Sequence, residues 1–243
     1  MLAKLGFPAL ATTSAGLSFT RGLPDTVTAL SVDEALDNIG EIVAAVSVPV
    51  NADFQAGYAR DAGDLANNVA RCVATGVAGL SIEDGTGVAD APLFELAEAT
   101  DRVRAARSAI DDAGADVMLT GRAECFLYGH PDPLAEAIRR LQAYAEAGAE
   151  VLFAPGVRTR EDIATLIDAL RPYPVNVLMS SDTGLTVSDL AQLGVRRISV
   201  GSAFSRVAWG AFLGATRRLI DDGSFGGLAG AASFDELNRL FTE

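Results

Sequence analysis

Short apolar runs alternate with segments of helical periodicity along most of the chain. Between the runs, apolar residues recur three or four positions apart, as Leu36, Ile39 and Val43 do after a capping box that begins at Ser31. Because strands and helices alternate, the pattern predicts an α/β fold with a parallel sheet. The runs rich in Val, Ala, Leu and Ile predict seven strands, at residues 8–13, 48–53, 77–82, 116–121, 150–155, 174–179 and 196–201.

The chain length and the repeat favour a (β/α)₈ TIM-type barrel. Such a barrel has about 250 residues in eight units, and this chain has 243. Only seven strands are predicted, and residues 2–6 resemble the end of a helix whose strand is absent. We therefore expect the first strand to be missing from this chain, through truncation or a misplaced start codon. A doubly wound open sheet is the alternative, but TTSAGLS after the first predicted strand is not its glycine-rich phosphate loop.

No linker divides the chain. We expect one barrel domain over residues 1–224, followed by a glycine-rich hinge and a short amphipathic helix over residues 225–243. That last helix either packs on a neighbouring subunit or folds back on its own barrel, and the composition favours neither.

Charge and composition exclude several classes of function. A formal net charge of −13 without a basic cluster argues against nucleic acid, whose phosphates would be repelled. No apolar run approaches the roughly 20 residues of a membrane span. The two cysteines, Cys72 and Cys125, provide neither a disulfide framework nor metal-ligand spacing, which favours a cytoplasmic protein with reduced thiols.

Three charged residues come at the ends of three successive predicted strands. They are Asp53, Glu83 and Arg122. In a parallel barrel these strand ends meet on the face that carries the chemistry. Two carboxylates suit a hard cation such as Mg²⁺, which takes one or two of them together with water and substrate oxygens. A guanidinium beside them suits an anionic substrate.

Other residues are weaker candidates for the same face. Asp25 either joins the acidic ring or stabilises a turn after proline. Ser14, Ala15 and Gly16 follow the first predicted strand, where small residues let backbone N–H groups approach an anion. The same residues also fill tight turns between a strand and a helix.

The remaining polar candidates each have a structural alternative. Arg122 could form a salt bridge with Glu124 or Asp84 instead of binding substrate. Asn176 lies near the end of its predicted strand and could donate a hydrogen bond to a substrate carboxylate. His130, the only histidine, precedes a helix in YGHPDPL and is typical of a solvated turn.

The motifs GFPALATTSAG, VPVNADFQAGY, GLSIED, LTGRAECF and GVRRISVGSAFSR resemble the isocitrate lyase/phosphoenolpyruvate mutase superfamily, in the expected order and over essentially the whole chain. The resemblance implies a (β/α)₈ barrel, a homotetramer in which the last barrel helix is exchanged between subunits, Mg²⁺ or Mn²⁺ as cofactor, and a 2-oxoacid or dicarboxylate as ligand. It implies the following roles: Asp25, Asp53 and Glu83 at the metal, some through water, and Ser14, Ala15, Gly16, Arg122 and Asn176 at the substrate.

Departures from the superfamily pattern narrow the activity. Asn51 stands where many members have a second aspartate beside the metal, which makes it a weaker candidate ligand. Residues 84–92 contain no cysteine, histidine or lysine, although the lyases carry a Lys-Lys-Cys-Gly-His type of loop there. We therefore do not expect cleavage of isocitrate or 2-methylisocitrate. Ala123 and Glu124 replace the usual Thr-Asp after the strand-end arginine.

The leading hypothesis is a Mg²⁺-dependent lyase that breaks a carbon–carbon bond next to a 2-oxoacid, or decarboxylates it, with Asp53, Glu83 and Arg122 as catalytic residues. The first alternative is carbon–phosphorus chemistry on phosphonopyruvate. The second is a degenerate barrel that binds a 2-oxoacid without turnover.

Overall fold

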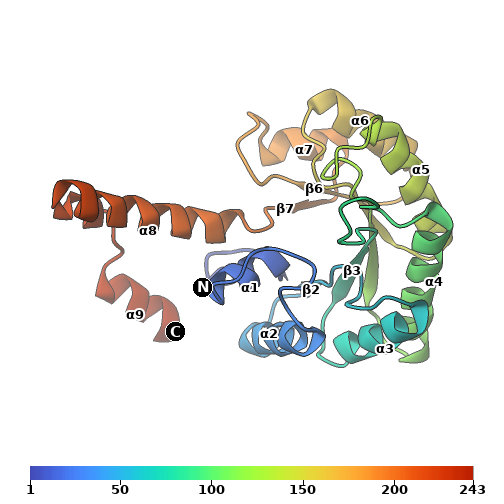
Figure 1. The fold of residues 1–243 in the computed structure, drawn as a ribbon, viewed down its shortest axis with the longest axis horizontal. Helices are drawn as coiled ribbons and strands as arrows, with labels where there is room; N and C mark the ends of the chain where they lie inside the picture. The colour runs from blue at the N-terminus through green and yellow to red at the C-terminus, as the bar shows by residue number, and fades with distance from the viewer. Residues whose placement is uncertain (243) are drawn as a thin grey trace.

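The computed structural model describes residues 1–242, and its centre is a seven-stranded parallel sheet (Figure 1). The strands follow one another in chain order, so each βα unit places its strand beside the previous one. All seven predicted strands are present, each shorter than its apolar run. Their bounds are β1 Leu10–Ala11, β2 Val50–Asp53, β3 Gly79–Glu83, β4 Met118–Arg122, β5 Val151–Phe153, β6 Val175–Leu178 and β7 Arg197–Ser199.

Helices cover the outer face of this sheet (Figure 1). The expected capping box at Ser31 is present, because the Ser31 hydroxyl accepts from the Glu34 amide and the Glu34 carboxylate accepts from the Ser31 amide. A short helix that the pattern did not predict, α1 (Ser14–Thr20), follows β1. The other covering helices are α2 Val32–Ala45, α3 Ala62–Val73, α4 Leu96–Asp112, α5 Pro133–Glu146, α6 Arg160–Ala169 and α7 Val187–Leu193.

The apolar core lies between the sheet and these helices. Outward-facing strand residues such as Leu80, Leu119 and Leu152 are fully buried there, together with Leu65 and Leu141 of the helices. Burying apolar surface in this shell is the main stabilising term of the fold. The inner face of the sheet carries most of the polar strand residues, which form the site described below.

The sheet does not close within residues 1–242. β1 pairs only with β2, and β7 pairs only with β6. The expected TIM-type barrel with seven strands is therefore confirmed, and it is open along a seam between β7 and β1.

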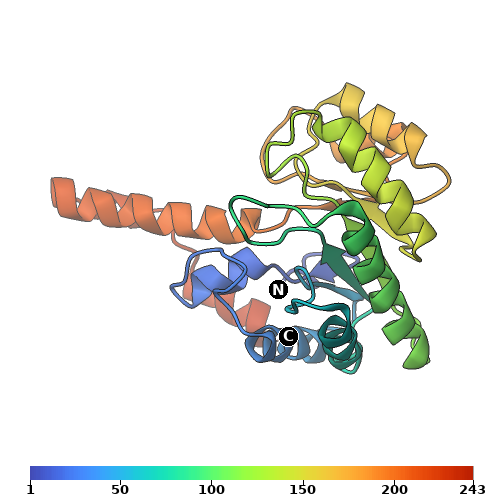
Figure 2. The same cartoon turned by 45° about the vertical axis from the view of Figure 1, so that its right-hand side comes forward.

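The C-terminal arm (residues 203–242) extends away from the barrel (Figures 1 and 2). It consists of α8 (Ala203–Asp222), a 3₁₀ turn η1 (Phe225–Leu228) and α9 (Phe234–Thr242), and no residue of these three elements is buried. Part of the expected glycine-rich hinge is the turn η1, which packs against α8. A Cβ on Gly227 would lie 2.7 Å from the Ala215 Cα, so only glycine allows η1 to approach α8 this closely.

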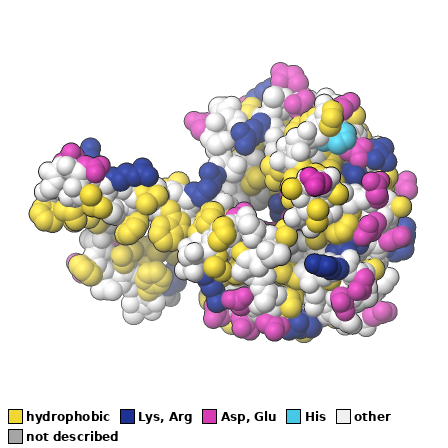
Figure 3. Space-filling model, viewed as in Figure 1, with side chains coloured by type: hydrophobic (Ala, Val, Ile, Leu, Met, Phe, Trp, Pro, Cys, Tyr) yellow, Lys and Arg dark blue, Asp and Glu magenta, His cyan; other side chains and the backbone are white. Residues whose placement is uncertain are grey.

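Apolar side chains of the arm face solvent in Figure 3. α9 reaches the start of the chain, where the Lys4 ammonium donates to the Leu240 carbonyl at 2.9 Å. Among the described residues, no helix combines the length and apolar character needed to cross a membrane. The exposed apolar residues of the arm are Phe204, Val207, Trp209, Phe212, Leu213, Leu219, Ile220, Phe225, Leu228, Phe234, Leu237 and Phe241.

Candidate active site

The structure brings Asp53, Glu83 and Arg122 together at the carboxyl ends of β2, β3 and β4. Each is the last residue of its strand, and Glu83 is the direct register partner of Arg122. One Arg122 nitrogen, Nη1, lies 3.0 Å from the Asp53 Oδ1 and 3.1 Å from the Glu83 Oε2. Parallel strands produce this convergence because their last residues share one edge.

A fourth charge, which the sequence pattern offered only as an alternative partner, completes this cluster. The Arg122 Nε lies 2.5 Å from the Glu124 Oε1, and the Glu124 side chain is 5% exposed. This salt bridge coexists with the contacts to Asp53 and Glu83. The Arg122 guanidinium also lies over the Phe153 ring, 5.3 Å from its centroid.

Burial and the neighbouring charges shift the pKa values of the cluster. Burial raises the pKa of Glu83 well above its ordinary value, Arg122 opposes this, and the carboxylates of Glu124 and Asp53 add to it. Burial is also the largest cause that raises the pKa of Glu124; Arg122 opposes it, and the carboxylates of Asp84 and Asp53 add to it. Burial alone would lower the pKa of Arg122, yet the surrounding carboxylates raise it. One guanidinium therefore does not neutralise this site.

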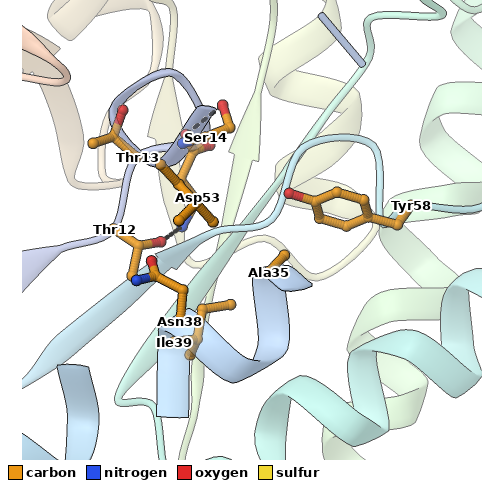
Figure 4. A pocket seen from close by; sticks show the side chains of 9 residues that line it. Thr12, Thr13, Ser14, Ala35, Asn38, Ile39, Asp53 and Tyr58 are labelled. Carbon is orange, nitrogen blue, oxygen red and sulfur yellow. Dashed lines mark hydrogen bonds between the residues drawn. The ribbon is translucent and has the colours of Figure 1, made fainter. Parts of the chain in front are cut away.

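The Asp53 carboxylate is held by the start of α1. The Ser14 amide and hydroxyl both donate to the Asp53 Oδ2, at 3.0 and 3.3 Å, and the Asp53 amide donates to the Thr12 hydroxyl (Figure 4). The Gly16 amide donates to the Thr13 hydroxyl. In this structure the backbone expected to receive a substrate carboxylate thus receives the Asp53 carboxylate, because α1 begins directly beside the end of β2.

A small pocket beside Asp53 is lined by side chains of the link between β1 and α1, of α1 and α2, and of the end of β2 and the loop after it (Figure 4). Tyr58 borders it and adopts a left-handed backbone conformation, with φ of 51°. Burial, followed by the charges of Asp53 and Glu83, raises the pKa of the Tyr58 phenol. Tyr58 is therefore a neutral hydrogen-bonding group at neutral pH.

The other candidates are placed differently. Asp25 is an exposed residue. Its pKa is raised by partial burial and by the charge of Asp53, and Arg122 opposes this rise. These interactions show that Asp25 lies near the cluster. Asn51 precedes Asp53 by two residues on β2, and its Oδ1 accepts a hydrogen bond from Arg197 at 3.3 Å. Asn176 is 3% exposed and donates through its amide to the Ser199 hydroxyl.

His130 and Cys125 lie outside the cluster. The His130 Nδ1 accepts from the Asp132 amide at 3.2 Å, within its own turn. Burial raises the pKa of the Cys125 thiol to about 12, so this thiol is neutral near pH 7.

The pattern missed a buried network that fixes the ends of β3 and β4. The Asp84 carboxylate accepts from the Tyr144 hydroxyl at 2.6 Å, from Arg140 at 3.1 Å and from the Glu124 amide at 2.8 Å. Asp84 was expected only as a possible partner of Arg122. Because Asp84 directly follows Glu83, the two side chains point to opposite faces of the sheet. This alternation of side chains along a strand was the signal in the sequence that could have placed Asp84 on the face opposite to Glu83.

The donor set fits a hard divalent cation held with the help of water. Among residues 1–242, no three His, Cys, Asp or Glu side chains are arranged to hold an ion by themselves. Mg²⁺ keeps several waters and needs only one or two carboxylates besides substrate oxygens. Asp53 and Glu83 supply two, and burial first, then neighbouring carboxylates, raise the pKa values of Asp25 and Glu83, so a cation would stabilise their charged forms.

The family model for phosphoenolpyruvate phosphomutase matches residues 1–220. The chain belongs to this family. The resemblance to the isocitrate lyase/phosphoenolpyruvate mutase superfamily is thereby confirmed, and its members are enzymes, lyases and mutases.

Individual relatives agree with this membership. A crystal structure from Burkholderia cenocepacia J2315, assigned as a lyase or mutase, is 42% identical with a TM-score of 0.94 and covers 100% of this chain and 86% of its own. Phosphoenolpyruvate phosphomutase of Streptomyces hygroscopicus is 31% identical over 97% of this chain and 77% of its own length. A phosphonopyruvate hydrolase crystallised with oxalate and Mg²⁺ is 27% identical, with a TM-score of 0.83, covering 98% and 84%.

Proposed function

We propose that the chain is a Mg²⁺-dependent (or Mn²⁺-dependent) lyase that cleaves a carbon–carbon bond next to a 2-oxo group, or decarboxylates such an acid. The observation that carries the proposal is the charge imbalance at the mouth of the barrel. The carboxylates of Asp25, Asp53, Glu83 and Glu124 surround the single guanidinium of Arg122. Such a site repels an anionic substrate until a cation joins it.

Different residues bind the cation and the substrate. Asp53 and Glu83 would hold the ion, and Asp25 would contribute its charge from the rim. Bound there, a divalent cation supplies Lewis-acid stabilisation of negative charge on the oxygens of a keto acid. Asn51 is left out of this set because its side-chain oxygen already accepts from Arg197.

Arg122 orients the substrate. Its guanidinium is fixed by Glu124 and Phe153, so little side-chain entropy is lost when it also binds a carboxylate. In a decarboxylation of oxaloacetate, the broken C–C bond leaves its electron pair on the remaining carbon, CO₂ departs, and one proton completes pyruvate. The Ser14 amide supports this chemistry by holding Asp53, and the buried Asn176 is a further candidate donor to a substrate carboxylate.

The test is Mg²⁺-dependent formation of pyruvate or glyoxylate across a panel of 2-oxo and 2-hydroxy diacids. The Asp53→Asn variant should lose at least about 100-fold in kcat/KM, because removing the cation site forfeits several kcal/mol of transition-state stabilisation. Asp112→Asn, an exposed position at the end of α4, is the matched control and should keep full activity. Metal-independent turnover, or an active Asp53→Asn protein, would refute the proposal.

Carbon–phosphorus chemistry is the second candidate, since the matching family model and one relative bear phosphonate-related names. Phosphate release or phosphoenolpyruvate formation from phosphonopyruvate, measured in the same panel, would favour it. Isocitrate and 2-methylisocitrate should not be cleaved, because residues 84–92 carry no thiol or imidazole to move the proton. Stabilisation by 2-oxoacids without any product would instead indicate a binding protein.

The C-terminal arm supports a homo-oligomer, for which a tetramer with exchanged helices is the proposed form. α8 buries none of its residues, and Phe212, Leu213 and Ile220 are 59%, 45% and 76% exposed. An apolar surface of this extent is typical of an interface. Light scattering of the purified chain should give about four times the mass of 25.2 kDa. A monomer at micromolar concentration would contradict the proposal.

A further inference from the structure

A second arginine side chain, that of Arg197, points into the barrel and takes no part in the cluster around Arg122. Arg197, on β7, donates through Nη1 to the Thr120 hydroxyl at 3.0 Å and to the Asn51 Oδ1 at 3.3 Å. Both partners are neutral, and in the described part of the chain Arg197 forms no salt bridge, unlike Arg122 with its three carboxylates. Its positive charge is therefore uncompensated.

Strand geometry places this charge directly beneath the candidate active site. Asn51 precedes Asp53 by two residues on β2, and Thr120 precedes Arg122 by two residues on β4. Residues two apart on a strand point to the same face and lie about 6.6 Å apart. The Arg197 guanidinium thus occupies the layer below the mouth of the barrel.

The surroundings of Arg197 contain a second polar group without a partner. Asn176 is its register neighbour on β6, is 3% exposed, and leaves its side-chain oxygen without a hydrogen bond among the described residues. The Asn176 amide nitrogen donates to the Ser199 hydroxyl at 3.0 Å.

The Arg197 side chain is partly buried, so its charge is only partly hydrated. Partial burial lowers the pKa of the guanidinium. A partly desolvated charge without an acid beside it is less stable than a paired one. The cost points to an anion that arrives from outside the chain.

We infer that Arg197 is a specificity-determining residue that binds the distal carboxylate of a dicarboxylic substrate whose 2-oxo end is held at Arg122. This inference rests on the proposed function and extends it to the substrate class. The outer oxygens of an extended four-carbon diacid are roughly 6 Å apart, from bonds of about 1.5 Å. A dicarboxylic substrate carries a second carboxylate for this charge, whereas a monocarboxylate such as pyruvate would leave Arg197 without a partner.

Calorimetric titration in the presence of Mg²⁺ tests the inference without requiring turnover. The probes are oxalate and pyruvate, which reach only the upper layer, and L-malate, a four-carbon dianion. The Arg197→Gln variant removes the charge and also shortens the side chain. It should bind L-malate roughly 10–100-fold more weakly, as expected for the loss of one charged contact, and should bind oxalate and pyruvate within twofold of the wild type.

Two further variants separate charge from packing. Arg197→Lys restores the charge and should recover part of the affinity for L-malate. Arg196→Gln removes the neighbouring arginine, which is exposed, and should leave all three affinities unchanged. Unfolding temperatures are measured for every variant.

The possible failures are distinguishable. If the wild-type protein binds oxalate but Arg197→Gln keeps its affinity for L-malate, the inference alone is overturned. If Arg197→Gln weakens all three ligands equally and melts earlier, Arg197 is a structural brace and the inference is also overturned. If the wild-type protein binds none of the probes with Mg²⁺, the proposed function itself fails.

Discussion

Arg102 on α4 should be one of the main determinants of stability near the site, although it touches no substrate-binding residue. It is 2% exposed and donates to three backbone carbonyls of the loop after β2, those of Ala56, Ala59 and Arg60. Its guanidinium also lies 4.4 Å from the centre of the Phe94 ring. We predict that Arg102→Met strongly destabilises the fold.

The magnitude follows from these contacts. Each hydrogen bond from a charged group contributes about 1.5–3 kcal/mol, and the buried carbonyls would lose their partner. Part of this loss is offset, because burial lowers the pKa of Arg102 and the variant no longer desolvates a charge. The net cost should be about 3–5 kcal/mol. For a chain of this size it corresponds to a fall in Tm of roughly 6–20 °C.

Thermal unfolding followed by circular dichroism is the assay, with Arg104→Met as the control on the same helix. The Arg104 side chain is 57% exposed and contacts only Asp101, so this variant should stay within about 0.5 kcal/mol of the wild type. Activity should also fall in Arg102→Met, because the loop supplies the Gln55 carbonyl that accepts from the Glu83 amide. If Arg102→Met melts within about 2 °C of the wild type, the reasoning about this loop is wrong.

Two further predictions concern the buried charges. Tyr144→Phe removes the 2.6 Å hydrogen bond to the Asp84 carboxylate and should lower the free energy of unfolding in urea by about 1.5–3 kcal/mol; an unchanged midpoint would contradict the assigned network. Glu83→Gln should raise the Tm of the metal-free protein at pH 7.5, because a folded-state pKa above the unfolded value means that ionised Glu83 costs stability. This gain in Tm should shrink as the pH falls below the raised pKa and vanish below about 4.5, where Glu83 is protonated in both the folded and the unfolded state. A gain in Tm that persists at pH 3 would show that the pKa of Glu83 is not raised by folding.

Periodicity was sufficient to predict the strands, the main helices and the shared edge at which Asp53, Glu83 and Arg122 meet. The reason is that a parallel barrel maps strand ends in the sequence onto one face in space. The same rule does not say which side chains contact one another across the barrel. The contact of Ser14 with Asp53 joins residues 39 positions apart and depends on where α1 begins.

Arg197 shows why part of the site could not be predicted. In RISVGS a single arginine at the start of an apolar run is typical of a solvated strand end, and nothing local distinguishes it from Arg196. Only the register of β6 with β7, and the open seam beyond β7, turn the Arg197 side chain toward Asn51 and Thr120. Sequence patterns predict on which face of a strand a side chain lies. Which residue that side chain contacts across the barrel depends on the tilt and closure of the whole sheet.

The two layers of the barrel interior have opposite charge, and this arrangement constrains the order of binding. The upper layer, around Arg122, is net negative, so a dianion approaching the mouth is repelled before it can reach Arg197 in the lower layer. A divalent cation at Asp53 and Glu83 removes that barrier. Cation binding should therefore precede substrate binding, and the affinity for L-malate should depend on Mg²⁺ concentration more steeply than the affinity for the monoanion pyruvate does. Equal dependence for the two acids would show that the layers do not act together.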